Sequence, residues 1–388
     1  MDVVLSNCRV VTPTGVLDRG TVDVSAGRIT AVRRSDDDTA AESLDLGGRW
    51  LVPGFVDIHA HGGGGASFDR GSPDEAARVV AAHRAHGTTT MLASLATAPR
   101  DTTVAALHGL TELVQEGLLA GVHLEGPFLS AARCGAHDPA LLTPPSRAHV
   151  EDLLSAGRGC VRMVTLAPEL EDGVEAVRQV VDAGALAAVG HTDGDYEVTV
   201  AAVEAGASVA THLYNAMPPM HHRAPGPVAA LMEHPAVTVE LINDGTHLHD
   251  AVVGLAVRSV GPGRAAFVTD AMAAAGKGDG DYHLSGRSVS VRDGVARLTG
   301  GDSIAGSTQT ADAALRRAVD QGLDIIDAVT CSSTTPARLL GLADTTGAVA
   351  AGLSADLVVL DSRLQVDAVM CRGEWLDGAR PPGAEVTP

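Results

Sequence analysis

The chain has few aromatic side chains and a single lysine. Phe, Trp and Tyr together account for 2% of the 388 residues, although 45% of the residues are hydrophobic. A large core is therefore available, but it has to be built from Ala, Val and Leu. Lys277 is the one lysine, so nearly all fixed positive charge is carried by arginine.

Cysteine pairs and long apolar runs are also missing. The five cysteines are odd in number and contain no C-x-x-C pair, so we expect no disulfide framework. The N-terminal segment MDVVLSNCRVV has no basic leader, and no apolar run approaches the length of a membrane span. These features predict a protein of the reducing cytoplasm without a membrane partner.

Positive charge is scarce as well, because the formal net charge is −20. Binding to nucleic acid or to an anionic membrane needs a basic face, so neither partner is expected. A small anionic substrate is still compatible with this charge, since a pocket can be locally basic on an acidic protein.

Strand and helix patterns alternate through the middle of the chain. A typical helical segment covers residues 72–87, with Ser72 as N-cap, Pro73 in the first turn and Gly87 at the end. Eight short apolar runs precede or separate such helices, near residues 55, 89, 122, 162, 187, 208, 238 and 266. Eight strand–helix units predict an α/β fold, a (β/α)8 TIM-type barrel over residues 54–345.

The two ends of the chain have strand character instead. Residues 1–53 are short β-branched runs divided by glycine and polar turns, and the same style returns within 346–388. Chain termini often lie close together, so these segments predict one small β-sandwich domain. Within the barrel, residues 282–300 place Asp-Gly between two strand-like runs, which predicts a β-hairpin insertion.

Histidines and carboxylates stand where the predicted strands end. His59 and His61 form H-x-H before four glycines, and alternate strand residues face the same side. The glycines, at 62–65, have no side chains to block a substrate. A lone histidine is more often structural, but this pattern at a strand end favours metal ligands.

Four further residues complete a metal-ligating pattern: Glu125, His191, His212 and Asp270. Glu125 could instead pair with an arginine, and Asp270 could cap the following segment. The order of the six residues over successive strands favours one or two divalent metal ions, zinc in particular. An acid such as Asp270 beside the metal can take a proton from water and return it to a leaving amine.

Nearly the whole chain resembles the amidohydrolase superfamily. Its motifs occur in the order VPGFVDIHAHG, HLEGPF, GHT, THLYNAM, DGTHLH, VTDAM and IAGS. The pair HLEGPF and THLYNAM is more specific and is similar to the N-acetylglucosamine-6-phosphate deacetylase family. The resemblance implies hydrolysis of the acetamide of N-acetyl-D-glucosamine 6-phosphate to D-glucosamine 6-phosphate and acetate, in amino-sugar catabolism, by a homodimer.

The resemblance also implies a role for each matching residue. Glu125, His191 and His212 match the common metal site, while His59 and His61 match ligands of a second metal. Some related barrels bridge two metals with a carbamylated lysine. No lysine lies on these strands, so Glu125 is the available bridge. Asp270 matches the catalytic acid and base, and His137 matches a group that polarises the acetamide carbonyl.

Substrate contacts follow in the same way. The matching residues are Ala136, Asn215, Ala216, Arg223, His247, Ile304, Ala305 and Gly306. Arg223 and His247 are expected near the phosphate, because a guanidinium suits that group, and one of them could be shared across a dimer. Taken alone, an arginine in a loop is more often a solvated surface charge.

Three other functions stay open at this point. The chain could deacetylate N-acetylgalactosamine 6-phosphate, hydrolyse N-acyl-amino acids, or act as a catalytically silent barrel that only binds. A silent barrel usually loses metal ligands, whereas all six are kept here. The sequence assigns no role to Cys134 or to the inserted hairpin, and it does not identify the metal.

Overall fold

The structure is a computed structural model that describes residues 2–34, 43–376, 381 and 385–387. Its chain divides into two compact units. One unit comprises Met1–Asp57, His83–Thr90 and Ala311–Pro388, and the other comprises Ile58–Ala82 and Met91–Thr310. The domain limits expected at residues 53 and 345 stay a prediction.

Eight parallel strands form a nearly closed barrel. In chain order they are β6 (Phe55–Asp57), β9 (Thr88–Ala96), β10 (Gly121–Glu125), β11 (Val161–Leu166), β12 (Leu186–Val189), β13 (Val209–Ala210), β14 (Thr238–Ile242) and β15 (Ala265–Val268). Just beyond the first and last strands, a parallel bridge joins Ala60 to Ala271, and the Asp270 N–H donates to the His59 carbonyl at 2.8 Å. The predicted α/β barrel is confirmed.

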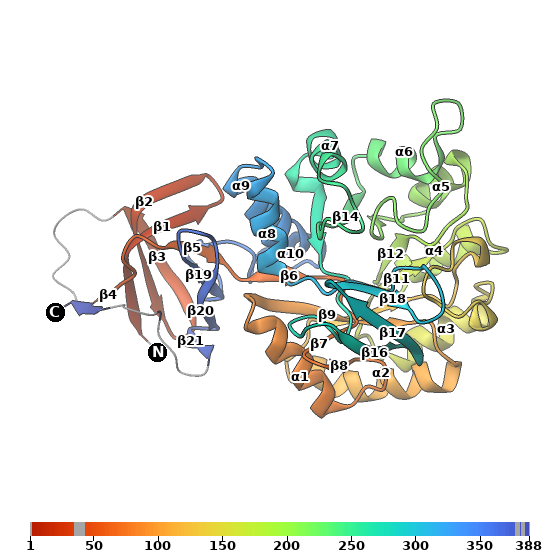
Figure 1. Cartoon of the computed structure of the whole chain (residues 1–388), viewed down its shortest axis with the longest axis horizontal. Helices are drawn as coiled ribbons and strands as arrows, with labels where there is room; N and C mark the ends of the chain where they lie inside the picture. Colours follow the sequence, from red (N-terminus) through yellow and green to blue (C-terminus); the bar gives the residue numbers. More distant parts are fainter. Residues whose placement is uncertain (1, 35–42, 377–380, 382–384, 388) are drawn as a thin grey trace. The chain divides into compact units, whose positions relative to one another are not determined.

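The helices between the strands agree with the predicted alternation. They are α1 (Pro73–Arg84), α2 (Arg100–Gln115), α3 (Arg147–Ala156), α4 (Gly173–Asp182), α5 (Tyr196–Glu204), α6 (Gly226–Glu233) and α7 (Asp250–Val260), followed by α8 (Ala311–Asp320), α9 (Ile325–Val329) and α10 (Thr335–Leu339). Helices α2 to α7 lie outside the barrel strands (Figure 1). As predicted, Ser72 caps α1, its Oγ accepting the Glu75 N–H at 3.4 Å. No helix in the described part is long and apolar enough to span a membrane.

The barrel strands are buried on both faces. Every residue of β10, β14 and β15 is buried, as expected for parallel strands covered by helices. Alanine, valine and leucine supply most of this core, and three of the four phenylalanines, Phe55, Phe68 and Phe128, are among its largest fully buried side chains. The scarce aromatic residues are therefore used mainly as interior filling.

The strands from both ends of the chain form one nine-stranded mixed sheet. Its path runs β21-β20-β19-β5-β1-β2-β3, and β4 pairs with β1 and β22. The strands are β1 (Val3–Thr12), β2 (Gly15–Ser25), β3 (Arg28–Arg34), β4 (Ser43–Asp45), β5 (Trp50–Pro53), β19 (Leu357–Leu360), β20 (Val366–Cys371), β21 (Glu374–Trp375) and β22 (Glu385–Thr387). An apolar core that includes Leu5, Val22, Leu357 and Trp375 belongs to this sheet, which confirms that the two ends fold together.

The insertion in the last barrel loop is larger than the predicted hairpin. It is a three-stranded antiparallel sheet of β16 (Gly280–Leu284), β17 (Arg287–Arg292) and β18 (Val295–Leu298). The Asp293-Gly294 turn was expected. Ser285-Gly286 makes a second turn, and all four turn residues have positive φ, as type I′ hairpin turns require. The Ser285-Gly286 dipeptide was the sequence signal for this second turn, and therefore for a third strand in the insertion.

Candidate metal centre and active site

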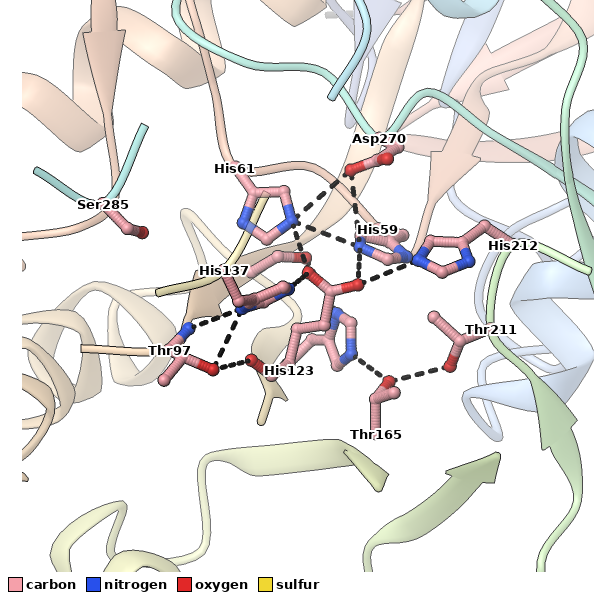
Figure 2. A network of polar contacts seen from close by, with 12 residues as sticks. His59, His61, Thr97, His123, His137, Thr165, Thr211, His212, Asp270 and Ser285 are labelled. Carbon is pink, nitrogen blue, oxygen red and sulfur yellow. Dashed lines mark hydrogen bonds and ion pairs between the residues drawn. The ribbon is translucent and has the colours of Figure 1, made fainter. Parts of the chain in front are cut away.

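The six predicted metal ligands meet at the carboxyl ends of the barrel strands. His59, His191, His212 and Asp270 each lie two residues beyond a strand, and Glu125 is the last residue of β10. Parallel strands bring these ends to one rim, which is where barrel active sites lie. Figure 2 shows the side chains of His59, His61, His212 and Asp270 turned toward one centre.

Glu125 lies between two groups of three ligands. Its Oε1 is 3.2 Å from His191 Nε2 and 3.1 Å from His212 Nε2. Its Oε2 is 3.2 Å from His61 Nε2, and His61 Nε2 is 3.4 Å from Asp270 Oδ1. The two buried groups, His59–His61–Asp270 and Glu125–His191–His212, are consistent with a binuclear metal site bridged by Glu125.

Three of these ligands have strained backbones. His191, His212 and Asp270 have φ angles of 48°, 28° and 47°, in the left-handed region that residues other than glycine seldom adopt. Such strain persists only where the surrounding fold imposes it, and it concentrates at functional sites. The strained turns direct all three side chains into the barrel mouth rather than along the strand.

Glycines beside the ligands allow close approach of other groups. A Cβ on Gly190, next to His191, would lie 2.6 Å from Thr211 Cβ. A Cβ on Gly62, next to His61, would lie 2.5 Å from the Ala66 carbonyl oxygen. Gly62 and Gly63 form strand β7, which pairs with β8 (Ala66–Ser67). Gly62 thus serves backbone packing, whereas Gly64 and Gly65 have φ angles of 62° and 82°, which glycine adopts readily.

In two of the ligand imidazoles, the ring nitrogen that faces away from the centre is hydrogen-bonded, and this bond orients the ring. His59 Nδ1 lies 3.0 Å from Glu240 Oε2, and His191 Nδ1 lies 2.7 Å from the carbonyl oxygen of Arg133. A carbonyl oxygen can only accept, so the Nδ1 of His191 carries its proton and the Nε2 lone pair faces the centre. Glu240 does the same for His59, since a carboxylate supports a ligand histidine in this way. The centre therefore offers nitrogen lone pairs to a cation.

The sequence interpretation missed Glu240. It lies in β14 with no exposed surface, and its Oε2 also accepts the backbone N–H of His212 at 3.0 Å. The signal was present in the run TVELI, which carries a carboxylate inside an apolar strand just as the run around Glu125 does. One buried carboxylate thus orients a ligand from each of the two groups.

Replacing Glu240 with glutamine is expected to weaken metal binding by about 10- to 100-fold, the usual effect of removing a partner that orients a ligand histidine. Both donors face Oε2, so an amide oxygen at that position can still accept from them, but it lacks the negative charge that makes a carboxylate a strong acceptor and a support for a ligand histidine. Chelator competition against the purified protein measures this affinity. Glu175→Gln is the matched control, because Glu175 is exposed and forms an ion pair with Arg178 in the same helix. Equal affinities in both variants would contradict the role of Glu240.

The electrostatics of the cluster favour a bound cation. Burial raises the pKa of Glu125, but His59 and then His137 outweigh it, so the pKa lies well below its usual range. The pKa of Asp270 is lowered in the same way, burial being outweighed by His59 and His61. Two ionised carboxylates in a buried space need positive charge nearby. Four imidazole nitrogens and two carboxylates are a donor set that fits divalent metal ions.

His137 presents a proton to the same centre. The backbone N–H of Thr97 points at His137 Nδ1 at 3.3 Å, and a backbone N–H can only donate. Nδ1 is therefore the acceptor, and the ring proton is on Nε2, which lies 3.3 Å from Glu125 Oε2. Burial lowers the pKa of His137 to about 4, which agrees with this neutral form. His137 is thus a hydrogen-bond donor beside the ligands.

A cavity of about 450 Å³ opens over the ligands. The predicted site residues that line it are His61, Glu125, Ala136, His137, His191, His212, Asn215, Ala216, His247, Asp270, Ile304 and Gly306. Three predicted residues are not among its lining in the described chain. His59 is fully buried, Ala305 packs in the apolar core of the insertion, and Arg223 is exposed, with its Nη1 2.7 Å from His222 Nε2.

A family model described as the amidohydrolase family matches residues 50–376. The chain belongs to the amidohydrolase family. The resemblance noted from its motifs is confirmed, and the match spans every barrel strand of this amidohydrolase together with the six ligands.

Individual relatives show which members of the family this chain is similar to. This amidohydrolase is 34% identical over 381 residues to N-acetylglucosamine-6-phosphate deacetylase of Bacillus subtilis, covering 96% of each chain. It is also 34% identical over 379 residues to N-acetylgalactosamine-6-phosphate deacetylase of Escherichia coli O157:H7, covering 96% of this chain and 99% of that one. Both relatives are deacetylases of a phosphorylated amino sugar.

A solved structure is more similar still. It is a point mutant of N-acetyl-D-glucosamine-6-phosphate deacetylase from Mycobacterium smegmatis, in complex with N-acetyl-D-glucosamine-6-phosphate. The sequences are 46% identical, the TM-score is 0.93, and the match covers 96% of this chain and 99% of that chain. The likeness therefore includes the barrel and the sheet from the chain ends.

Positive groups at the cavity were also missed from the sequence. Arg287 and Arg297 line the cavity, and their hydrogen bonds go to backbone carbonyls. The carboxylates of Asp138 and Asp302 line the same cavity. His247 lines it too. Burial lowers the pKa of His247, but the Asp244 carboxylate at 2.7 Å outweighs burial and raises it. The cavity of this acidic amidohydrolase therefore holds cationic groups beside the carboxylates that line it.

A chain of hydrogen bonds next to the ligands contains His123, another histidine that the sequence interpretation missed. His123 Nδ1 lies 2.9 Å from Ser94 Oγ, and its Nε2 lies 2.8 Å from Thr165 Oγ1. Thr165 Oγ1 lies 2.8 Å from Thr211 Oγ1 (Figure 2). The ring of His59 packs edge-on against His123, with centroids 4.6 Å apart. His123 is two residues before Glu125 on β10, so the alternation of strand side chains was a usable signal.

Proposed function

We propose that this amidohydrolase removes the acetyl group from N-acetyl-D-glucosamine 6-phosphate, giving D-glucosamine 6-phosphate and acetate. The arrangement of Glu125 between two ligand groups, with His137 and Asp270 beside it, carries the proposal. The cationic groups of Arg287, Arg297 and His247 at the cavity suit a phosphorylated sugar, and relatives that match almost the full length are deacetylases of such sugars.

The proposed cofactor is zinc, with one or two ions held by His59, His61, Glu125, His191, His212 and Asp270. Imidazole and carboxylate donors are those that catalytic zinc uses. The bound ion would make water a stronger acid and polarise the acetamide carbonyl.

The protein groups divide the proton transfers between them. Asp270 takes a proton from the attacking water, whose oxygen forms a bond to the acetyl carbon. His137 donates its Nε2–H to the carbonyl oxygen while negative charge develops there. Asp270 then gives its proton to the sugar nitrogen as the C–N bond breaks, which releases acetate and the free amine.

Substrate recognition is proposed for the residues around the cavity. Asn215, Ala216, His247, Ile304 and Gly306 line it and are placed to contact the sugar and its phosphate, and Ala136 and Ala305 belong to the loops that shape it. We further propose that the enzyme is a cytoplasmic homodimer in which the exposed Arg223 reaches the phosphate of the partner's substrate. Light scattering after gel filtration tests the dimer.

A second candidate is the deacetylation of N-acetylgalactosamine 6-phosphate. The relative from Escherichia coli O157:H7 favours it, because its identity to this chain, 34%, equals that of the glucosamine enzyme from Bacillus subtilis. The two substrates differ only in the orientation of the hydroxyl on the fourth carbon of the sugar. Comparing kcat/KM for the two sugars decides between them.

Acetate release from a panel of substrates tests the proposal. The zinc-loaded protein is given both phosphorylated sugars, the same sugars without phosphate, and N-acetyl-amino acids. We expect kcat/KM to be highest with N-acetyl-D-glucosamine 6-phosphate and far lower without the phosphate. A protein that holds metal but releases no acetate from any phosphorylated amino sugar would refute the proposal.

Metal removal is expected to abolish this activity. A chelator strips the ions, and activity should return when zinc is restored, because the carboxylates and imidazoles alone cannot activate water sufficiently. Elemental analysis of the stripped and reloaded protein accompanies each rate. Full activity in protein shown to be free of metal would contradict the proposed cofactor.

A further inference from the structure

The three-stranded insertion, β16–β18, has no part in the proton transfers described so far, although its Arg287 and Arg297 line the cavity. We infer that its Arg287 is a positioning residue for the deacetylation, acting on the loop that carries His137. This inference rests on the proposed function. The loop comprises residues 130–138 and is called here the His137 loop.

Arg287 holds the backbone of this loop at two consecutive residues. Its Nη1 donates to the carbonyl oxygens of Ala136 and His137, each at 3.1 Å. Within the described chain, neither carbonyl has another hydrogen-bond partner. Buried carbonyl groups need partners, and a guanidinium supplies several donors in a rigid plane. One side chain therefore satisfies both carbonyls next to the imidazole that faces the centre.

Apolar packing supports the same contact. Ala136 packs against the buried core of the insertion, which includes Leu284, Val289 and Ala296. The guanidinium bonds and the apolar contact thus attach the His137 loop to the sheet at Ala136 and His137. The loop has little secondary structure of its own beyond the single turn Ala131–Arg133.

The insertion is itself anchored close to Arg287. The turn between β16 and β17 contains Ser285, whose backbone N–H and Oγ both bond the Asp69 carboxylate, at 2.9 and 3.1 Å. Ser67 Oγ donates to the same carboxylate at 3.2 Å. Arg287 follows this turn directly, as the first residue of β17, so its backbone is held while its side chain reaches across to the His137 loop.

The His137 loop contacts the centre at more than one point. His137 Nε2 lies 3.3 Å from Glu125, while the carbonyl of Arg133 receives the proton of His191 Nδ1. A Cβ on Gly135 would lie 3.1 Å from the His191 ring. A small shift of the loop would therefore misplace the His137 proton donor, and a misplacement of about 1 Å can reduce a rate by a factor of 100.

Direct contact with the phosphate is the competing role for Arg287, since it lines the cavity. The two roles predict different kinetics. A phosphate contact is made in the ground state, so its loss raises KM with kcat kept. Loss of a positioning residue lowers kcat because the donor to the developing oxyanion is misplaced, and it leaves KM nearly unchanged.

The test compares Arg287→Ala and Arg287→Lys with Arg292→Ala in zinc-loaded protein. Arg292 is a matched control, because it lies on the same strand but its hydrogen bonds within the described residues stay inside the insertion, to Gly280, Asp281 and Val291. We expect Arg287→Ala to lower kcat by about 10- to 100-fold with KM changed less than about threefold. Arg287→Lys should recover part of kcat, since an ammonium can still donate to one carbonyl, and Arg292→Ala should resemble the wild type.

Hydrogen–deuterium exchange supplies a readout that needs no substrate. Peptides from the His137 loop should exchange faster in Arg287→Ala than in the wild type or in Arg292→Ala. Unchanged kcat together with unchanged exchange would overturn the inference, as would a rise in KM with kcat intact. A wild type without acetate release would refute the proposed function instead, and the exchange data would still show whether Arg287 holds the loop.

Discussion

Replacing Asp270 with asparagine is expected to lower kcat by about 100- to 10,000-fold, the usual contribution of a group that transfers protons in the transition state. Asparagine cannot take the proton from water or return it to the amine. It is nevertheless a good structural match, because Asp270 has a φ of 47°, and asparagine tolerates the left-handed region better than other residues. Steady-state acetate release measures the loss.

The backbone contacts of Asp270 should survive this change. Its N–H donates to His59 at 2.8 Å and its carbonyl accepts from Ser307 at 2.7 Å, and both are main-chain groups. Metal binding is expected to persist in part through His59 and His61. Asp324→Asn is the control for loss of one negative charge, because Asp324 is exposed and caps α9, a position where asparagine works equally well. A variant at position 270 that kept most of its activity would exclude Asp270 as the proton carrier.

Replacing Glu125 with glutamine is expected to have the largest effect on metal binding. The carboxylate faces His61 and His137 with one oxygen and His191 and His212 with the other, so both ligand groups lose charge when it becomes an amide. We expect the affinity to fall by more than about 100-fold, beyond the loss caused by removing a partner that only orients a ligand. Elemental analysis after gel filtration measures the metal that remains.

Comparison with Glu240→Gln separates the loss of a metal ligand from the loss of a group that orients one. Both residues are buried carboxylates at the ends of hydrogen bonds from histidines, but only Glu125 faces the cation position. We expect Glu125→Gln to lose more metal than Glu240→Gln. Glu175→Gln should hold as much metal as the wild type. Two full equivalents of metal in Glu125→Gln would show that this carboxylate does not bridge the ions.

Much of the site was predictable because its signals are local. Each ligand follows an apolar run, and parallel strands bring their carboxyl ends to one rim whatever the loops between them do. His59 and His61 were paired by strand alternation alone. The resemblance added His137, whose position in the sequence carries no such local signal, and the structure places it beside Glu125.

Other parts of the site depend on contacts between residues far apart in the chain. Glu240 and His59 are 181 positions apart, and Arg287 is 150 positions from His137. A carboxylate in β14 or an arginine in an insertion looks the same in the sequence whether it supports a ligand or faces solvent. Arg223 illustrates the reverse case, because it was expected near the phosphate and is exposed in the single chain.

The order of elements, the (β/α)8 architecture and the identity of the metal ligands follow from hydrophobic periodicity and residue type, which act over a few neighbouring positions. The left-handed backbones of His191, His212 and Asp270, the protonated nitrogen of His137 and the hold of Arg287 on its loop arise only in the folded chain. These features need partners that packing brings together. Without those partners, an isolated segment would not adopt a strained turn, and neither nitrogen of a histidine ring would be selected to carry the proton.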